Sequence, residues 1–245
     1  MLAGLLASGR RRRAARRAPE GALRRYLQTP LPAASTALTE LPLLAVDLET
    51  TGFDPRNHRV LSVGFVPVDG DRIVLGGAHQ MLVRSGSGTG HRLGRAAGDG
   101  GVGQSATVHG ITDDAVAAGE PVAAVLDRLF TALEGRILLA HYCRIEIDFL
   151  GALCREVYGV GLPLQVVDTL ELQRRVLGGG TGDQFETTAA PGQLRLAGAR
   201  HRYGLPDHRA HDALADALAC AELYLAQVAE LAERGARHLR HVRTP

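Results

Sequence analysis

The sequence predicts an α/β protein built around one mixed, five-stranded sheet flanked by helices. Apolar runs bounded by turn residues come first, and helical apolar spacing then alternates with short apolar runs. Early strands joined by tight turns form an antiparallel meander, whereas strands separated by helices form parallel crossovers. We predict a tail and linker over residues 1–40, one domain over 41–235, and a C-terminal tail over 236–245.

Five segments carry strand signals. The first is a short apolar run that begins at Leu43 and ends in acidic residues. Asp69-Gly70 lies between two apolar runs, the strongest short-range signal for a hairpin turn. The predicted strands are residues 43–49, 59–68, 72–83, 136–140 and 164–167.

Helical periodicity occupies most of the remaining chain. Apolar residues between 122 and 133 recur three or four positions apart, as on one face of a helix. Two glycine-rich segments, 85–103 and 178–191, have no periodicity and are predicted as surface loops. The predicted helices are residues 112–119, 121–133, 145–158, 169–177, 194–203 and 212–234.

Charge is distributed unevenly along the chain. Residues 1–25 hold eight Arg against Glu20 alone, and the remainder has 20 Arg against 25 Asp and Glu. The Arg cluster follows the apolar start, the reverse of a secretory signal, although an Arg-rich, acid-poor start also resembles a transit peptide. We favour a solvated or disordered tail that adds weak phosphate contacts. No run is apolar enough to cross a bilayer, so we expect no membrane association.

The three cysteines, Cys143, Cys154 and Cys220, are odd in number and lack metal-ligand spacing. Each lies in an apolar or helical context. The sequence therefore predicts buried, reduced thiols and a cytoplasmic protein.

The first candidate site follows the first strand. Asp47 and Glu49 are two residues apart, so on a strand they point to the same face. Buried carboxylates need a compensating partner, and paired oxygen ligands suit Mg²⁺ or Mn²⁺. Thr50-Thr51-Gly52 then allows close approach of a substrate backbone. The alternative is a strand that simply ends in a polar turn.

A second cluster lies at the start of the predicted helix 145–158. Glu146 shares a side with Leu150 and faces inward, whereas Asp148 faces solvent. Glu146 is therefore a candidate metal ligand. The alternative is an acid in the first helical turn that is favoured by the helix dipole.

A third cluster lies at the start of the last long helix. His211 precedes it, Asp212 is a plausible N-cap, and Asp216 faces inward one turn later. An imidazole beside bound metal ions suits proton removal from water, and a structural histidine is the alternative. Asp168, at a strand-to-helix junction, is either a ligand or, as we favour, a helix cap.

Together these residues resemble the DEDDh branch of the DnaQ-like 3′→5′ exonucleases, which includes bacterial relatives of the polymerase III epsilon proofreading subunit. The resemblance covers about residues 41–230. It rests on Asp47-x-Glu49-Thr50-Thr51-Gly52, His141…Glu146…Phe149-Leu150 and His211-x4-Asp216, with support from Ser105-Ala106-x-x-His109-Gly110-Ile111-Thr112 and Asp168-Thr169-Leu170.

The resemblance implies a ribonuclease H-like fold and hydrolysis of phosphodiester bonds with two Mg²⁺ or Mn²⁺ ions. It implies that Asp47 bridges the ions, that Glu49 and Asp216 help hold the inner one, that Glu146 serves the outer one, and that His211 is the base. The partners implied are 3′ ends of single-stranded DNA or RNA, and a DNA polymerase or repair machinery. The substrate contacts implied are Leu48, Thr50, Thr51, His109 and Ile111; a helix-start role is the alternative for the last two.

The chain departs from the family pattern in one segment. Tyr142 stands where the family usually has Asn, and Glu146 stands where it usually has Asp. Glu keeps the carboxylate and adds one methylene, so we expect activity to survive. The remaining histidines are expected at the surface: His58, His79, His91, His201 and His208.

The resemblance leaves the substrate open. We favour a DNA exonuclease of the proofreading or repair type, with an RNA 3′-trimming enzyme as the alternative, since sugar selection depends on pocket shape. A non-catalytic module that binds nucleic acid or a polymerase is a further alternative. No long tail follows the final predicted helix, so we expect a free-standing enzyme.

Overall fold

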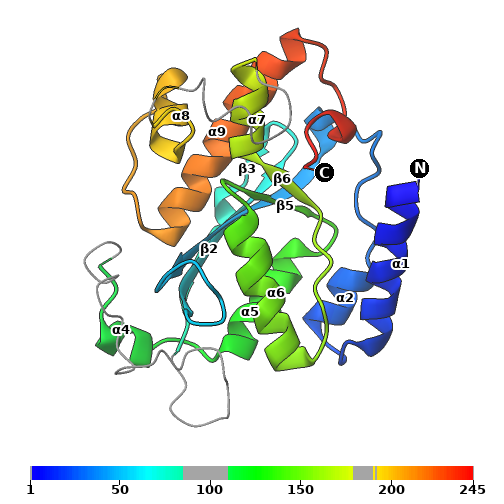
Figure 1. Ribbon diagram of the computed structural model, residues 1–245, viewed down its shortest axis with the longest axis vertical. Coiled ribbons are helices and arrows are strands. Elements are labelled where there is room, and N and C mark those ends of the chain that lie inside the picture. The colour runs from blue at the N-terminus through cyan, green and yellow to red at the C-terminus, as the bar shows by residue number, and fades with distance from the viewer. Residues whose placement is uncertain (1, 85–109, 179–189, 191, 245) are drawn as a thin grey trace.

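The computed structural model describes residues 2–84, 110–178, 190 and 192–244. Its centre is a mixed sheet in which β1 (Pro42–Thr50) pairs antiparallel with β2 (Val60–Asp69) and parallel with β5 (Ile137–Ala140). Next to β5 lies β6 (Val166–Asp168), also parallel. The meander and the parallel crossovers therefore follow the predicted order (Figure 1).

Among the described residues, the sheet has six strands where the sequence predicts five. The expected strand 72–83 is split into β3 (Arg72–Ile73) and β4 (His79–Leu82), both on the same edge of β2, by a 3₁₀ turn at Leu75–Gly77. Pro67 explains the break. Its carbonyl accepts from Val74 N on this edge (2.9 Å), so the N–H that proline lacks would have faced the same edge.

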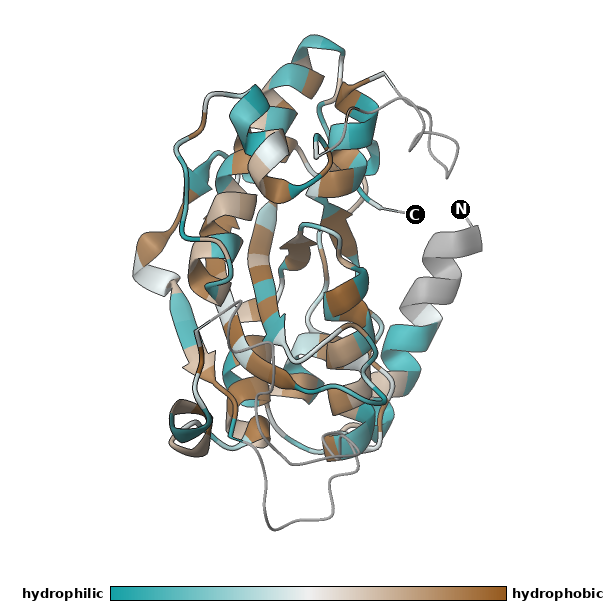
Figure 2. Cartoon of the chain, turned by 60° about the vertical axis from the view of Figure 1, so that its left-hand side comes forward, coloured by the Kyte–Doolittle hydropathy of each residue, from teal (hydrophilic) through white to brown (hydrophobic). Residues whose placement is uncertain are grey.

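The helices cover both faces of the sheet. On one face lie α5 (Val122–Leu133) and α6 (Arg144–Tyr158), and on the other lie α7 (Thr169–Val176) and α9 (Ala213–Glu233) (Figure 1). Hydrophobic residues run along the central strands and the adjoining sides of the helices (Figure 2). Shorter helices are α4 (Asp113–Ala117) and α8 (Leu196–Arg202), with 3₁₀ turns at Leu38–Glu40 and Leu239–His241.

Side chains of β1 alternate between these two faces. Leu44 and Val46 join the cluster with α5 and α6, whereas Leu43 and Ala45 join the cluster with α7 and α9. Continuing this alternation places Asp47 and the residue two further on over the face that α9 covers.

The N-terminal segment is helical and partly buried, so the expected solvated tail is wrong for its inner half. α1 (Leu2–Arg17) is followed by α2 (Ala22–Gln28), which packs on α5. Tyr26 is 1% exposed, and its ring stacks on Phe130 with centroids 5.7 Å apart. Apolar packing on α2 decides its position. The domain boundary at residue 40 stays a prediction.

Close backbone packing brings α9 onto the sheet. Gly64 on β2 lies directly opposite Asp47 on β1. A Cβ added at Gly64 would lie 2.2 Å from the carbonyl carbon of Ala213, the first residue of α9. Only glycine permits this approach, and the approach brings the first turn of α9 over the carboxylates of β1.

Within the described residues, no helix is long and apolar enough to cross a membrane. The predicted loops 85–103 and 178–191 lie almost entirely outside the described residues, as do Ser105, Ala106, His91 and His109.

Candidate active site

Asp47 and Glu49 present two carboxylates near the carboxyl end of β1. Glu49 is 8% exposed, and its strand partner on β2 is the fully buried Ser62. A register shift between Glu49 and Thr50 ends the regular ladder at this point. The common orientation predicted for the two carboxylates follows from the strand alternation.

Glu146 adds a third carboxylate from the first turn of α6. Its side chain is 3% exposed, and its Oε2 atom is buried without a hydrogen-bond partner in the part of the chain described. Burying a carboxylate oxygen without a partner costs free energy, and a bound cation would supply the missing partner. Asp148 instead faces outward, as predicted, and it pairs with Arg144.

Asp216 supplies the fourth carboxylate from the first turn of α9. Its Oδ2 accepts from the backbone N–H of His211 at 2.7 Å. Asp212 caps the helix by accepting from Ala215 N, so the predicted N-cap is confirmed. Glu49, His211 and Asp216 each offer one ligand atom within 4.8 Å of the others.

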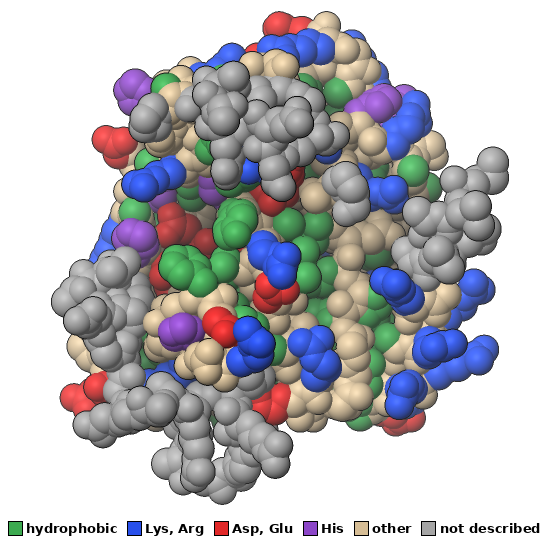
Figure 3. Space-filling view, in the orientation of Figure 1, with side chains coloured by type: hydrophobic (Ala, Val, Ile, Leu, Met, Phe, Trp, Pro, Cys, Tyr) green, Lys and Arg blue, Asp and Glu red, His purple; other side chains and the backbone are tan. Residues whose placement is uncertain are grey.

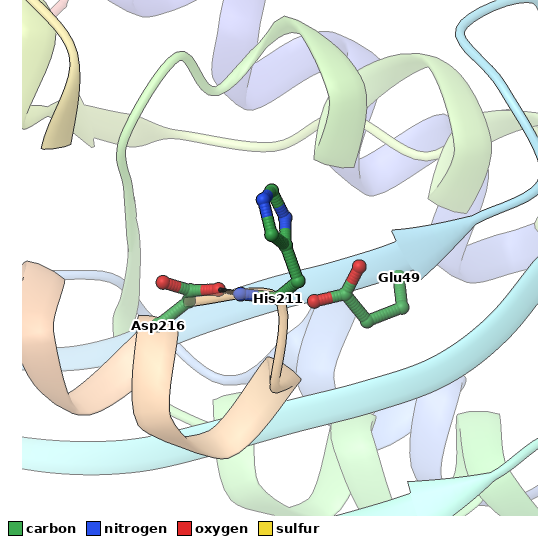
Figure 4. A group of neighbouring side chains, drawn as sticks. All are labelled: Glu49, His211 and Asp216. Atoms are coloured by element: carbon green, nitrogen blue, oxygen red, sulfur yellow. Dashed lines mark hydrogen bonds between the residues drawn. The ribbon is translucent and has the colours of Figure 1, made fainter. Parts of the chain in front are cut away.

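His211 is held in an unusual backbone conformation. Its φ angle is 63°, in the left-handed region that non-glycine residues adopt at a cost. Its side chain is exposed, and Figure 4 shows the imidazole rising between the carboxylates of Glu49 and Asp216. Strain of this kind at a residue beside the carboxylates of Glu49 and Asp216 fits a side chain whose direction is fixed by the fold.

His208 is not the surface histidine that the sequence predicts. Its Nε2 lies 2.7 Å from Asp216 Oδ1, and both side chains are 13% exposed. Sequence reasoning missed this residue because the segment before α9 has no periodicity from which an orientation can be read.

The carboxylate of Asp168 caps α7 and stabilises the turn that precedes α6. Its carboxylate accepts from Leu170 N at 2.9 Å, which caps α7. The same carboxylate accepts from the backbone N–H groups of Tyr142 (2.9 Å) and Cys143 (3.0 Å). Tyr142 has a φ of 66°, so this carboxylate stabilises a strained turn that leads into α6. The cap that we favoured is therefore confirmed.

His141 joins the site to the segment before α8. Its ring nitrogens lie 2.9 Å from Thr169 Oγ1 and 2.9 Å from the carbonyl oxygen of Leu194. Burial lowers the pKa of His141, which favours the neutral ring. A neutral ring can donate from Nε2 to the carbonyl oxygen of Leu194, which ties this segment to the turn before α6.

The carboxylates destabilise one another's charges. Burial, with the neighbouring Glu146 and Asp216, raises the pKa of Asp47 well above its usual value. Burial, Asp216 and Asp212 raise the pKa of Glu49 to about 7. Burial and, to a smaller extent, Asp168 raise the pKa of Glu146 to about 8. Such a cluster favours protons or cations.

Within the described residues, no Arg side chain forms an ion pair with this cluster. Among the ion pairs of the described residues, the only one that includes Asp47, Glu49, Glu146 or Asp216 is the pair with His208. Within the described residues, the cluster has oxygen donors on three elements, a buried oxygen without a partner and little compensating charge. Hard divalent cations such as Mg²⁺ or Mn²⁺ fit a cluster of this kind. Figure 3 shows acidic side chains gathered on this face, bordered by histidines and large hydrophobic side chains.

The residues expected to contact substrate have different exposures. The side chain of Leu48 is buried in the α5 and α6 cluster, so its backbone is the part that can reach a substrate. Thr50 Oγ1 donates to Gly52 O at 2.8 Å, and Thr51 Oγ1 accepts from Arg59 N at 3.0 Å. Ile111 packs beside Leu61. His109 lies outside the described residues.

The three cysteines are free and buried, as predicted. Burial raises the pKa of each thiol, which keeps the thiols protonated and poorly reactive. They therefore add no ligand to the carboxylate cluster.

Comparison with known proteins defines the class. The Exonuclease family model, RNase_T, matches residues 103–224. A DNA polymerase III subunit epsilon-like protein of Rhodobacter capsulatus is 30% identical over 206 residues, which cover 82% of this chain and 26% of that protein. The DNA polymerase III subunit epsilon of Treponema pallidum is 24% identical over 82% of this chain and 83% of its own length.

Solved structures share the fold. The nuclease domain of 3'hExo, a DEDDh family member bound to rAMP, has a TM-score of 0.59 at 17% identity and covers 77% of this chain and 92% of that domain. Escherichia coli Exonuclease I in complex with a dA16 oligonucleotide has a TM-score of 0.60 at 17% identity, covering 79% of this chain and 42% of that one.

Sheet order, the carboxylate cluster and these matches define a ribonuclease H-like nuclease domain. The chain belongs to the DnaQ-like 3′→5′ exonuclease family. It spans about a quarter of the length of the Rhodobacter relative.

Proposed function

We propose that this chain removes nucleotides from the 3′ ends of single-stranded nucleic acid, with DNA as the favoured substrate, by hydrolysing phosphodiester bonds. The observation that carries the proposal is the convergence of four carboxylates from β1, α6 and α9, with a buried oxygen of Glu146 that has no hydrogen-bond partner among the described residues. Family membership and the nucleic acids named in the titles of the two solved structures support the reaction class.

Each carboxylate has a place in the proposed mechanism. Two Mg²⁺ or Mn²⁺ ions, when bound, neutralise charge on the phosphate and on the leaving oxygen. Asp47, whose charge interacts with those of Glu146, Asp216 and Glu49, would contact both ions; Glu49 and Asp216 would hold one, and Glu146 would hold the other. The raised pKa values of Asp47, Glu49 and Glu146 mean that cation binding displaces protons.

His211 is assigned as the general base. Its imidazole is exposed beside Glu49 and Asp216, so it can take a proton from a water that attacks the phosphorus atom. The backbone near Leu48 and the hydroxyls of Thr50 and Thr51 are assigned to the terminal nucleotide. These roles agree with the arrangement of the residues and await the experiment below.

The test uses purified protein with 3′- and 5′-labelled DNA and RNA oligonucleotides in Mg²⁺, Mn²⁺ or EDTA. We expect stepwise shortening from the 3′ end that needs the metal and is abolished in Asp47→Ala. Cleavage in EDTA, or wild-type activity in Asp47→Ala, contradicts the proposal. Faster shortening of RNA than of DNA selects the RNA-trimming alternative, and binding without cleavage selects the non-catalytic module.

The setting of the reaction is part of the proposal. The names of the relatives from Rhodobacter and Treponema connect those proteins with DNA polymerase III. We propose a repair or processing enzyme in the cytoplasm, where buried, free cysteines stay reduced. Co-purification with a DNA polymerase would instead favour a polymerase-associated role.

A further inference from the structure

We propose that His208 is a positioning residue that holds the carboxylate of Asp216 in place for metal binding. The proposal rests on the function proposed above, because it gives Asp216 the role of a metal ligand. It adds a residue that lies outside the family motif His211-x4-Asp216 and that the sequence alone places at the surface.

Hydrogen bonds hold both oxygens of Asp216. Oδ1 faces Nε2 of His208 at 2.7 Å, and Oδ2 accepts from the backbone N–H of His211 at 2.7 Å. A carboxylate has about four lone-pair sites, so each oxygen keeps a free lone pair for a cation. The two bonds therefore fix the direction of the carboxylate without blocking it.

Burial makes the contact with His208 a strong constraint. Both side chains are only 13% exposed, so neither can exchange its partner freely for water. An N–H donated from Nε2 of His208 satisfies Oδ1 of the carboxylate. Holding a ligand in place by a hydrogen bond from behind is the usual way in which proteins orient metal-ligating groups.

The loop that carries His208 is itself anchored. Arg200 on α8 is 3% exposed and donates to the carbonyl oxygen of Pro206 at 2.8 Å. The same guanidinium donates to Ala219 O at 2.7 Å and pairs with Glu222, both on α9. The loop is thus tied to the helix that carries Asp216, which keeps His208 within reach of its carboxylate.

His208 supports the ligand set and does not join it. The ligand atoms that lie within 4.8 Å of one another belong to Glu49, His211 and Asp216, and His208 is not in this group. Its imidazole contacts Asp216 alone among the four carboxylates in the ion pairs of the described residues. Its effect must therefore pass through Asp216.

The experiment measures metal binding directly. Mn²⁺ is titrated into the full chain and free Mn²⁺ is followed by electron paramagnetic resonance, for wild type, His208→Ala, His208→Gln and His208→Asn. Glutamine can place an amide N–H near the position of Nε2, whereas the asparagine side chain is too short to do so. His201→Ala is the matched control, because His201 is an exposed histidine on α8.

We expect His208→Ala and His208→Asn to bind Mn²⁺ about 10-fold or more weakly, since outer partners of metal ligands typically contribute this much. His208→Gln and His201→Ala should bind like wild type. The Mn²⁺ concentration for half-maximal cleavage should rise in parallel, with a smaller change in kcat at saturating metal. Thermal unfolding without metal reports whether each variant is folded.

Three results overturn the inference, and each has a different meaning. If wild type and folded His208→Asn bind Mn²⁺ equally well, His208 only packs the loop and the proposed function stands. If the wild-type chain binds no Mn²⁺ at all, the proposed function fails and takes the role of His208 with it. Equal losses in His208→Gln and His208→Asn also contradict the inference, because the position of the donor would then not matter.

Discussion

Two regions of this molecule treat charge in opposite ways. On the side of α1 and α2, some of the arginines have partners: the guanidinium of Arg11 lies 4.2 Å from the centroid of the Tyr26 ring, and Arg25 pairs with Glu134. In the candidate active site, four carboxylates converge and only Asp216 has an ion-pair partner among the described residues. The first arrangement stabilises the fold, whereas the second keeps a binding capacity at the expense of stability.

Replacing Asp47 by Asn should have the largest effect, because it removes one of the four converging carboxylates. Loss of a bridging ligand should lower cleavage by about 10³-fold, which corresponds to about 4 kcal/mol in the barrier. The same change removes repulsion from Glu146 and Asp216 and should stabilise the metal-free protein by about 1 kcal/mol, or about 2–4 °C in Tm. Oligonucleotide cleavage and calorimetry measure the two effects, and lower activity with lower Tm would show that Asp47 is structural.

Replacing Tyr26 by Ala tests the other region. The ring is 1% exposed and stacked on Phe130, so its loss should cost about 3–5 kcal/mol in the free energy of unfolding. Activity per folded molecule should stay the same, because α2 lies away from the carboxylates. Tyr26→Phe keeps the ring and serves as the control in denaturant titrations. An Ala variant as stable as wild type would restore the predicted solvated tail.

Gly64 on β2 should affect both the stability of the fold and the position of the site residues on α9. Gly64→Ala places a methyl group against the backbone at Ala213 and should cost about 1–3 kcal/mol through overpacking. Because α9 must shift to make room, cleavage should fall in the folded protein as well. Gly76→Ala is the matched control, since no atom lies within 4 Å of the added Cβ. If both variants behave alike in unfolding and cleavage, the close approach of α9 has no role.

Sequence alone predicts the parts of the site that lie on regular elements. Strand alternation places Asp47 with Glu49, and helical spacing turns Glu146 inward, because period and burial are linked there. His208 and Gly64 depend on how a loop and a helix meet the sheet, which no local pattern encodes. The charge of the Arg-rich start predicts a solvated tail, whereas the buried apolar residues of α2, such as Leu23 and Leu27, pack this segment against the domain.

Stability of the metal-free protein should depend on pH through the raised carboxyl pKa values. A carboxyl whose pKa is higher in the folded state favours folding below its unfolded value and loses this contribution as pH rises through the folded value. For Glu49 and Glu146 the loss runs from about pH 4.5 to about 7 and 8 respectively. Tm without metal should fall over this window, and Mn²⁺ should raise Tm most at its upper end. A Tm that rises across the window in EDTA would contradict the coupling.

The smallest expected effect belongs to Glu146→Asp, which shortens the reach of the carboxylate by one methylene. The Oε2 atom of Glu146 is buried and has no hydrogen-bond partner among the described residues, as expected of a side chain that holds a cation. Aspartate at the same point of α6 matches the residue usual in the family, so cleavage should stay the same or rise, with a change within about 10-fold, or 1.4 kcal/mol. Asp148→Ala is the control and should change cleavage little, because Asp148 pairs outward with Arg144. If Asp148→Ala loses most of its cleavage activity and Glu146→Ala loses none, the ligand role belongs to Asp148. If Glu146→Ala is inactive and Glu146→Asp is active, cleavage requires the buried carboxylate at position 146.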